Sequence, residues 1–259
     1  MEKNSDLNIL PVKDLPDDDP RPLNPILPKP PSLLLMISPI RTGKSTIISN
    51  LLLNSNFYGQ DFFDETIVFS PTINNDKTSR FLKKSATCYD GYTDELMMEI
   101  VKKQSDYDDS PDRPSLAVIL DDIIGTIRRE AFVNGLASRF RHYGIDLLLM
   151  SSQNYRKVSP VIRSNATHMI IGSPFPNNKE LGKIFEEVGD QFGGYDNMEA
   201  IYRAATPNKY DFLFLDLTEN PPIARKNFGE IIARGGQGYK SKVENADFNL
   251  GGGEKETEE

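Results

Sequence analysis

An apolar, strand-like run, Leu33–Ile37, leads directly into a loop that contains glycine and lysine, and then into a helix-like stretch. The loop reads Ser-Pro-Ile-Arg-Thr-Gly-Lys-Ser-Thr over residues 38–46. It nearly matches G-x-x-x-x-G-K-[ST], a pattern in which backbone N–H groups and the start of a helix surround a polyphosphate. Because this pattern requires a strand before it and a helix after it, it constrains the fold more than any other feature of the chain.

The second half of the loop carries the expected chemistry. Lys44 would place its ammonium on the outer phosphates, and Ser45 would offer its hydroxyl to Mg²⁺. The first glycine of the pattern is replaced by Ser38, which costs on the order of 1 kcal/mol if that position requires positive φ. The residues expected to bind the nucleotide are Ser38, Arg41, Thr42, Gly43, Lys44, Ser45 and Thr46.

A second apolar run, Leu116–Leu120, ends in two carboxylates, Asp121 and Asp122. Ligands of α/β sheets bind at the carboxyl ends of the strands, so this run would deliver both acids beside the loop. Asp121 is expected to hold Mg²⁺ through water. Asp122 is expected to orient or deprotonate the attacking water, although many hydrolases of this kind have the longer glutamate there.

A third apolar run, Asp146–Ser151, is followed by Gln153. Neighbouring parallel strands end at one edge, so Gln153 would be within reach of the γ-phosphate or the attacking water. Taken alone, this motif and the Asp-Asp motif are more typical of ordinary strand ends. The phosphate loop that precedes them favours the functional interpretation.

An arginine near the γ-phosphate accelerates phosphoryl transfer by about 10³-fold or more, and in ring-shaped motors it comes from the next subunit. Arg141 and Arg163, on either side of the third strand, are the main candidates, and Arg139, Arg128 and Arg129 are weaker ones. The alternative is that all of them are surface charges.

Several other functions are excluded by composition. His142 and His168 lie far apart, and the single cysteine, Cys88, has no partner at metal-ligand spacing, so neither a zinc site nor a disulfide framework is expected. No apolar run approaches the ~18 residues of a membrane span, and no secretory signal is visible. We therefore expect an intracellular protein without a membrane partner.

Strand-like and helix-like segments alternate along the chain, which predicts an α/β domain with a mainly parallel central sheet flanked by helices. The expected strands are Leu33–Ile37, Thr66–Ser70, Leu116–Leu120, Asp146–Ser151, His168–Gly172 and Asp211–Leu217. The expected helices are Lys44–Leu53, Thr93–Lys103, Ile127–Tyr143 and Asn178–Val188.

The two ends of the chain differ from its centre. Eight of the 18 prolines fall in residues 1–31, which indicates an extended arm, free or laid over a surface. Glycines and charges dominate residues 235–259, which indicates a flexible tail. Residues 32–234 remain as the nucleotide-binding domain.

Three other functions remain open for a chain with this loop. D-x-x-G at residues 122–125 and N-K-x-D at residues 208–211 imitate a GTPase, but the second precedes an expected strand and would lie at the edge opposite the nucleotide. A small-molecule kinase would need a lid with arginines and an acceptor pocket, and neither is identifiable. An adaptor that holds ATP without hydrolysing it is favoured by Ser38 and by the short side chain of Asp122.

Taken in order, the motifs resemble those of the FtsK–HerA superfamily of DNA-pumping ATPases, and within it the genome-packaging ATPases of poxviruses, giant viruses and virophages. The resemblance extends over residues 32–220. The segments that carry it are Ser38–Thr46, Leu116–Asp122, Arg139–Gln153 and Ser159–Asn165.

This resemblance implies a RecA-like P-loop NTPase with the sensor strand between the two Walker strands, and ATP and Mg²⁺ as cofactors. It implies a homo-oligomeric ring, usually a hexamer, that threads double-stranded DNA. It also implies a role in loading viral DNA into a capsid, with capsid or portal proteins as further partners, in the host cytoplasm, a viral factory or the virion. The net charge of −8 is compatible with this role if only the pore loops are basic.

Overall fold

One nine-stranded sheet forms the centre of the described structure, with strand order β3-β2-β4-β5-β1-β6-β7-β8-β9. The computed structural model describes residues 21–236 apart from residues 22, 76–78, 108–109, 111, 125–126, 128–130 and 177. The strands are β1 Ser32–Ile37, β2 Glu65–Phe69, β3 Thr87–Tyr89, β4 Leu116–Leu120, β5 Leu147–Ser152, β6 His168–Ile171, β7 Leu213–Asp216, β8 Ile223–Lys226 and β9 Ile231–Arg234.

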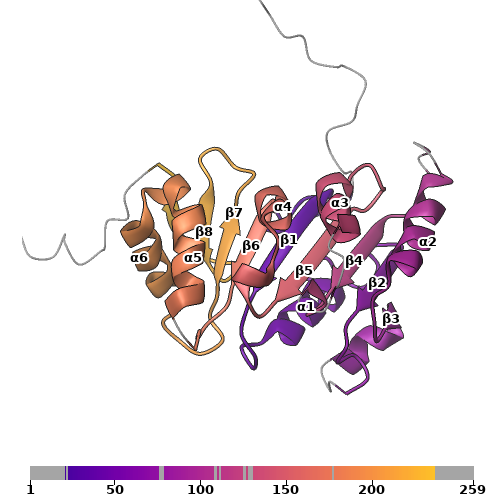
Figure 1. Cartoon of the computed structure of the whole chain (residues 1–259), viewed down its shortest axis with the longest axis horizontal. Coiled ribbons are helices and arrows are strands. Elements are labelled where there is room, and N and C mark those ends of the chain that lie inside the picture. The colour runs from indigo at the N-terminus through magenta and orange to yellow at the C-terminus, as the bar shows by residue number, and fades with distance from the viewer. Residues whose placement is uncertain are drawn as a thin grey trace, which may run out of the picture.

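The helices connect these strands. The α-helices are α1 Lys44–Leu53, α2 Asp94–Ser105, α3 Ala131–Arg139, α4 Pro160–Asn165, α5 Asn178–Val188 and α6 Tyr195–Ala205. Short 3₁₀ helices are η1 Ser79–Lys84, η3 Tyr155–Lys157 and η4 Gly189–Phe192. The pair α5 and α6 packs together at the end of the sheet that contains β7 and β8 (Figure 1).

Strand direction divides the sheet into two parts. The six strands from β3 to β6 pair in parallel, and β7, β8 and β9 are added antiparallel. The mainly parallel sheet expected from the sequence is confirmed. So is the position of the third apolar run, β5, between β1 and β4.

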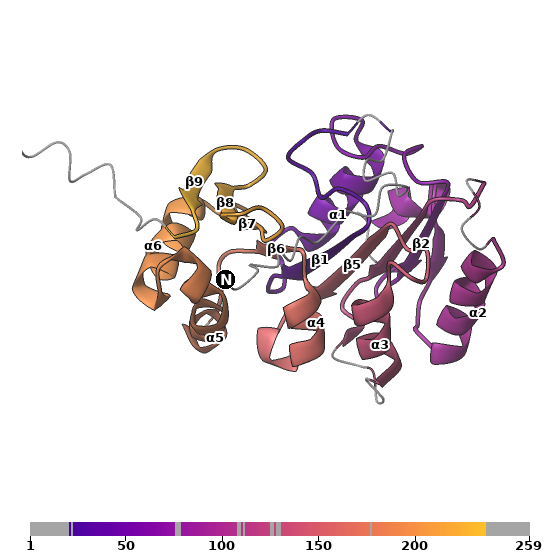
Figure 2. The same cartoon turned by 90° about the horizontal axis from the view of Figure 1, so that it is seen from above.

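The central strands are apolar on both faces because both faces are covered. Every residue of β1, β4 and β5 is buried. One face packs against α2 to α6, with Met97, Val133 and Ile162 in its core. The other packs against α1, with Ile48 and Leu51 in its core. The two layers of helices on either side of the sheet are visible in Figure 2.

The last part of the proline-rich arm lies on the α1 side of the sheet. Leu27 is buried there, and the Tyr58 hydroxyl donates a hydrogen bond to the carbonyl of Pro28 over 2.6 Å. Arg21 donates to the carbonyl of Phe62 over 2.7 Å. Residues 1–20 of the arm and 237–259 of the tail lie outside the described residues.

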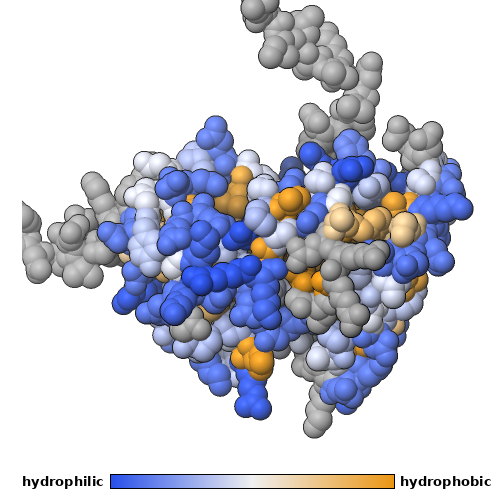
Figure 3. Space-filling view, in the orientation of Figure 1, coloured by the Kyte–Doolittle hydropathy of each residue, from blue (hydrophilic) through white to orange (hydrophobic). Residues whose placement is uncertain are grey.

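Most of the surface in view is hydrophilic, with apolar side chains in separate patches (Figure 3). Within the described residues, no helix combines the length and the apolar character that crossing a bilayer requires.

Candidate functional site

The parity of the strands decides which polar side chains meet the phosphate loop. Side chains alternate between the two faces of a strand, so residues two positions apart share a face. Val68, Ile119 and Leu149 pack on the α1 side of the sheet. Two positions further along each strand or strand end come Ser70, Asp121 and Ser151, which therefore lie on the same side, next to the start of α1.

The phosphate loop is closed by its own side chains. Ser38 is buried, its hydroxyl is hydrogen-bonded to that of Thr42, and the Thr42 hydroxyl donates to the carbonyl of Pro39 over 2.6 Å. The positive φ angles of the loop fall at Arg41 and Gly43, with values of 63° and 95°. Ser38 is not in the left-handed region, so the strain that was expected if this position needed positive φ does not arise.

The position that must be a glycine lies just after the neighbouring strand and not in the loop itself. Gly172 directly follows β6, and a Cβ atom built on it would lie only 2.1 Å from the hydroxyl oxygen of Ser38. The serine therefore fits in the loop because residue 172 has no side chain.

Lys44, Asp122 and Gln153 are brought together, although they come from three different elements. The Lys44 ammonium lies 2.5 Å from Oδ1 and 2.6 Å from Oδ2 of Asp122. The Gln153 amide donates to Oδ2 of the same carboxylate over 3.0 Å. Asp122 has a φ of 53°, and its backbone N–H donates to the hydroxyl of Ser151 over 3.0 Å. This strained turn at the end of β4 aims the carboxylate at the loop.

Asp121 is the more deeply buried of the two acids. It is 7% exposed, and its two oxygens accept hydrogen bonds from Ser70 over 3.0 Å and from Ser151 over 2.6 Å. Burial raises the pKa of this carboxyl; the Asp122 charge acts in the same direction, and the serines and Lys44 oppose it. The sequence analysis did not assign a role to either serine. Each could have been found as a hydroxyl residue at the end of an apolar strand, at a position whose side chain points to the same face of the sheet as Asp121.

Lys44, Asp122 and Gln153 line one cavity of about 620 Å³. Its lining residues are Pro39, Ile40, Arg41, Gly43, Lys44, Ser45, Thr46, Thr72, Asp122, Gln153, Lys209 and Tyr210. The size is within the range of small-molecule sites. The residues also fit a magnesium nucleotide. Gly43 leaves the first N–H groups of α1 without a side-chain cap, Ser45 in the cavity wall would be a hard oxygen ligand, and Asp121, outside that wall, would act through water.

The N-K-x-D stretch lies beside the phosphate loop, so the expectation that it would lie at the opposite edge is wrong. The reason is the direction of β7, which runs antiparallel to β6 and therefore begins at the edge where the parallel strands end. The Asp211 carboxylate is nevertheless engaged by side chains of its own turn and of the end of β8. Its oxygens accept from Asn227 over 3.1 Å and from the Asn208 amide over 3.0 Å, and Lys226 lies 3.2 Å away.

The two main arginine candidates do not line the cavity. Arg163 is in the last turn of α4, where it donates to Glu187 over 2.7 Å and lies 4.8 Å from the centre of the Tyr155 ring. Its side chain is 13% exposed. Arg141 and Arg139 are exposed on the segment that ends α3 and leads to β5, and Arg128 and Arg129 lie outside the described residues.

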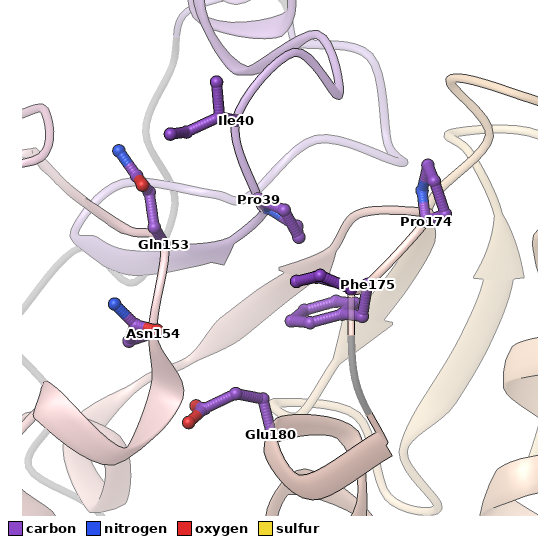
Figure 4. Close-up of a pocket in the computed structure, with 8 residues that line it drawn as sticks. Pro39, Ile40, Gln153, Asn154, Pro174, Phe175 and Glu180 are labelled. Atoms are coloured by element: carbon purple, nitrogen blue, oxygen red, sulfur yellow. The ribbon is translucent and has the colours of Figure 1, made fainter.

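A second hollow, of about 360 Å³, borders the first at Gln153 and at the tip of the phosphate loop. Figure 4 shows Pro39 facing Phe175 across it, with Ile40 above, Pro174 behind Phe175 on the same side, Gln153 and Asn154 on the opposite side and Glu180 below. Ile40 is 69% exposed at this tip.

Comparison with known proteins places this geometry in a known fold. No family model and no curated protein matches the chain. Among solved structures, it is similar to B204, the DNA-packaging ATPase of Sulfolobus turreted icosahedral virus, with 16% identity and a TM-score of 0.58 over 77% of this chain and 99% of that one. The chain has the fold of the P-loop ATPases.

Two further structures have this fold. The genome-packaging NTPase B204 of Sulfolobus turreted icosahedral virus 2, in complex with ATP-gammaS, gives a TM-score of 0.54 at 15% identity and covers 76% of this chain and 98% of that one. The type VII secretion ATPase EccC of Thermomonospora curvata gives 0.50 at 14% identity, with 76% of this chain matching 25% of that one.

Proposed function

We propose that the chain is a magnesium-dependent ATPase of the FtsK–HerA type that translocates double-stranded DNA and packages a viral genome. The observation that carries the proposal is the convergence of Lys44, Asp122 and Gln153 on one cavity beside Asp121 and Ser45. These are the groups that hydrolysis of a nucleoside triphosphate requires. The fold that the chain shares with two viral packaging ATPases supports the choice of DNA as cargo.

In the proposed reaction, Lys44 leaves Asp122 and binds the outer phosphate oxygens. Asp122, released from the ammonium, accepts a proton from water while Gln153 orients that water. The water oxygen forms the new bond to the γ-phosphorus, and the bond from that phosphorus to the bridging oxygen of ADP breaks. Mg²⁺, held by Ser45 and Asp121, would neutralise charge on the β- and γ-oxygens.

The trans-acting arginine of this proposal is Arg141. A side chain that reaches a neighbouring subunit must be free to leave its own, and Arg141 is exposed whereas Arg163 is largely buried against Glu187 and Tyr155. A homo-oligomeric ring, a hexamer in the proposal, would then couple hydrolysis to assembly. Capsid or portal proteins are the further partners that packaging requires.

The test is ATP hydrolysis by the full chain with and without double-stranded DNA, with GTP for comparison and Lys44→Ala as the inactive control. A motor hydrolyses ATP faster with DNA, and the stimulation weakens as salt rises because the contacts are made to phosphates. Tight ATP binding without turnover would instead support the non-hydrolysing adaptor. Strong preference for GTP would support a switch.

A further inference from the structure

Tyr210 is an exposed aromatic residue in the wall of the cavity that contains Lys44. The residue is 55% exposed, and it lines the cavity together with Lys209, whose ammonium lies 4.8 Å from the centre of the ring. The ring also lies against the phosphate loop, because a Cβ atom built on Gly43 would be 3.6 Å from its Cδ1 atom. An exposed aromatic ring in the wall of a cavity, beside a phosphate loop, is well placed to contact a bound ligand.

The backbone holds Tyr210 in a conformation that its side chain disfavours. Its φ is 72°, in the left-handed region, and strain of this kind in bulky residues gathers at ligand sites. The surrounding turn maintains it: the Asp211 N–H donates to the Asn208 carbonyl over 3.2 Å, and the Asn208 N–H donates to the Asp211 carboxylate over 3.1 Å. This closed turn presents residues 209 and 210 to the cavity.

The order of the sheet separates the two ends of the cavity. Asp122 follows β4 and Gln153 follows β5, on one side of β1, whereas Tyr210 precedes β7, on the other side. The phosphate loop after β1 lies between them. A nucleotide whose outer phosphate meets Asp122 and Gln153 would therefore extend its nucleoside toward Tyr210.

We infer that Tyr210 is the stacking platform for the base of the bound nucleotide, and that this site accepts adenine and guanine alike. The inference rests on the proposed nucleotide site. Stacking on an aromatic ring tolerates every base, since each has a π-face. A guanine-specific site needs a free carboxylate for the edge of the base, and the Asp211 carboxylate is already engaged by Asn208, Asn227 and Lys226.

The chain has no tryptophan, so a single introduced indole reports on one position. In Tyr210→Trp, magnesium with ATP or GTP should change the tryptophan fluorescence, and magnesium with inorganic tripolyphosphate should not. Tyr195→Trp is the matched control, because Tyr195 is also exposed, at 42%, but is on α6 and does not line the cavity. None of the three ligands should change its fluorescence.

Equilibrium binding completes the test. Tyr210→Ala should weaken the binding of ATP and of GTP by about tenfold and leave tripolyphosphate binding unchanged. Tyr210→Phe, which keeps the aromatic ring, should bind all three ligands as the wild type does. Equal ATP affinity in wild type and Tyr210→Ala would overturn the inference and leave the proposed function intact. Equal losses for ATP and tripolyphosphate would also overturn it, since Tyr210 would then only support the loop. If the wild-type protein binds neither ATP nor tripolyphosphate, the proposed function itself fails.

Discussion

Lys44 and Asp122, 78 residues apart in the chain, form an ion pair in which the ammonium meets both carboxylate oxygens, at 2.5 and 2.6 Å. The side chains are 9% and 23% exposed, so water screens the pair only in part. A lysine cannot bind this carboxylate and a phosphate with equal strength at once. At the proposed site, the ion pair and a bound nucleotide would therefore compete for Lys44.

This competition separates binding from turnover in Asp122→Asn. The amide carries no charge and should release Lys44, so ATP should bind as tightly as in wild type or several-fold more tightly. Hydrolysis should fall by about 10²–10⁴-fold, the usual contribution of a general base. Equilibrium binding and single-turnover hydrolysis measure the two effects, with Lys44→Ala as the variant that loses binding. Weaker ATP binding in Asp122→Asn would contradict the proposed competition.

The contact between Ser38 and Gly172 predicts a rescue. Gly172→Ala would place a methyl group 2.1 Å from the Ser38 hydroxyl, which forces the phosphate loop to move, so nucleotide binding should fall by tenfold or more. Ser38→Gly removes the obstructing side chain, and the double variant should recover most of the binding. Affinity for ATP in the two single variants and the double variant gives the coupling. A double variant no better than Gly172→Ala would refute the proposed packing.

The central strands and the meeting of Lys44, Asp122 and Gln153 at one edge of the sheet could be predicted because their signals are local. β1, β4 and β5 are continuous apolar runs, and each ends in the polar residues expected of a nucleotide site. The antiparallel strands β8 and β9, at one end of the sheet, gave no such signal, because they have four residues each and include arginine or lysine. The helix α6 does carry a local signal, an apolar stripe at helical spacing that consists of Met198, Ile201, Tyr202 and Ala205.

The position of residues 208–211 could not be predicted because a strand's sequence does not encode its direction. Whether β7 runs parallel or antiparallel to β6 depends on how the intervening α5 and α6 pack, which is a property of the whole domain. The need for a glycine at residue 172, and not at residue 38, also depends on the tertiary structure and could not be predicted. The two residues are far apart in the chain and meet only across neighbouring strands.

The two arginines should respond differently to truncation. Arg163→Ala removes the charged hydrogen bond to Glu187, which keeps Tyr155 and Lys183 as partners, and removes the contact with the Tyr155 ring. The folded state should therefore lose about 1–3 kcal/mol and several degrees in Tm. Arg141→Ala, at an exposed position, should change stability by less than about 0.5 kcal/mol. Thermal unfolding of both variants distinguishes them.

Mixing experiments then locate the trans-acting arginine. Arg141→Ala and Lys44→Ala proteins are each expected to be inactive alone, and mixing them should restore part of the ATPase activity, because some interfaces join an intact loop to an intact arginine. Recovery with Arg163→Ala in place of Arg141→Ala, measured at a temperature where Arg163→Ala is still folded, would transfer the role to Arg163. No recovery with either at any ratio would leave the trans arginine without support.

His168 should make the stability of the fold depend on pH. It is 3% exposed, and burial lowers its pKa from 6.5 to about 4, although Asp216, whose oxygen lies 3.4 Å from Nε2, opposes the shift. Between these values the unfolded chain binds a proton that the folded chain does not, so the free energy of unfolding rises with pH across this window and the gain is complete above 6.5. The gap corresponds to about 3 kcal/mol at most.

The comparison that isolates this effect uses the only other histidine. His168→Gln should flatten the dependence of the free energy of unfolding on pH between 4 and 6.5, whereas His142→Gln, at an exposed position, should keep the wild-type slope. Asp121, with its raised pKa, makes stability fall as pH rises in its own range, but all three proteins contain it and its contribution cancels in the differences. Denaturant titrations at several pH values supply these slopes, and identical slopes for His168→Gln and wild type would show that the buried imidazole is not the source.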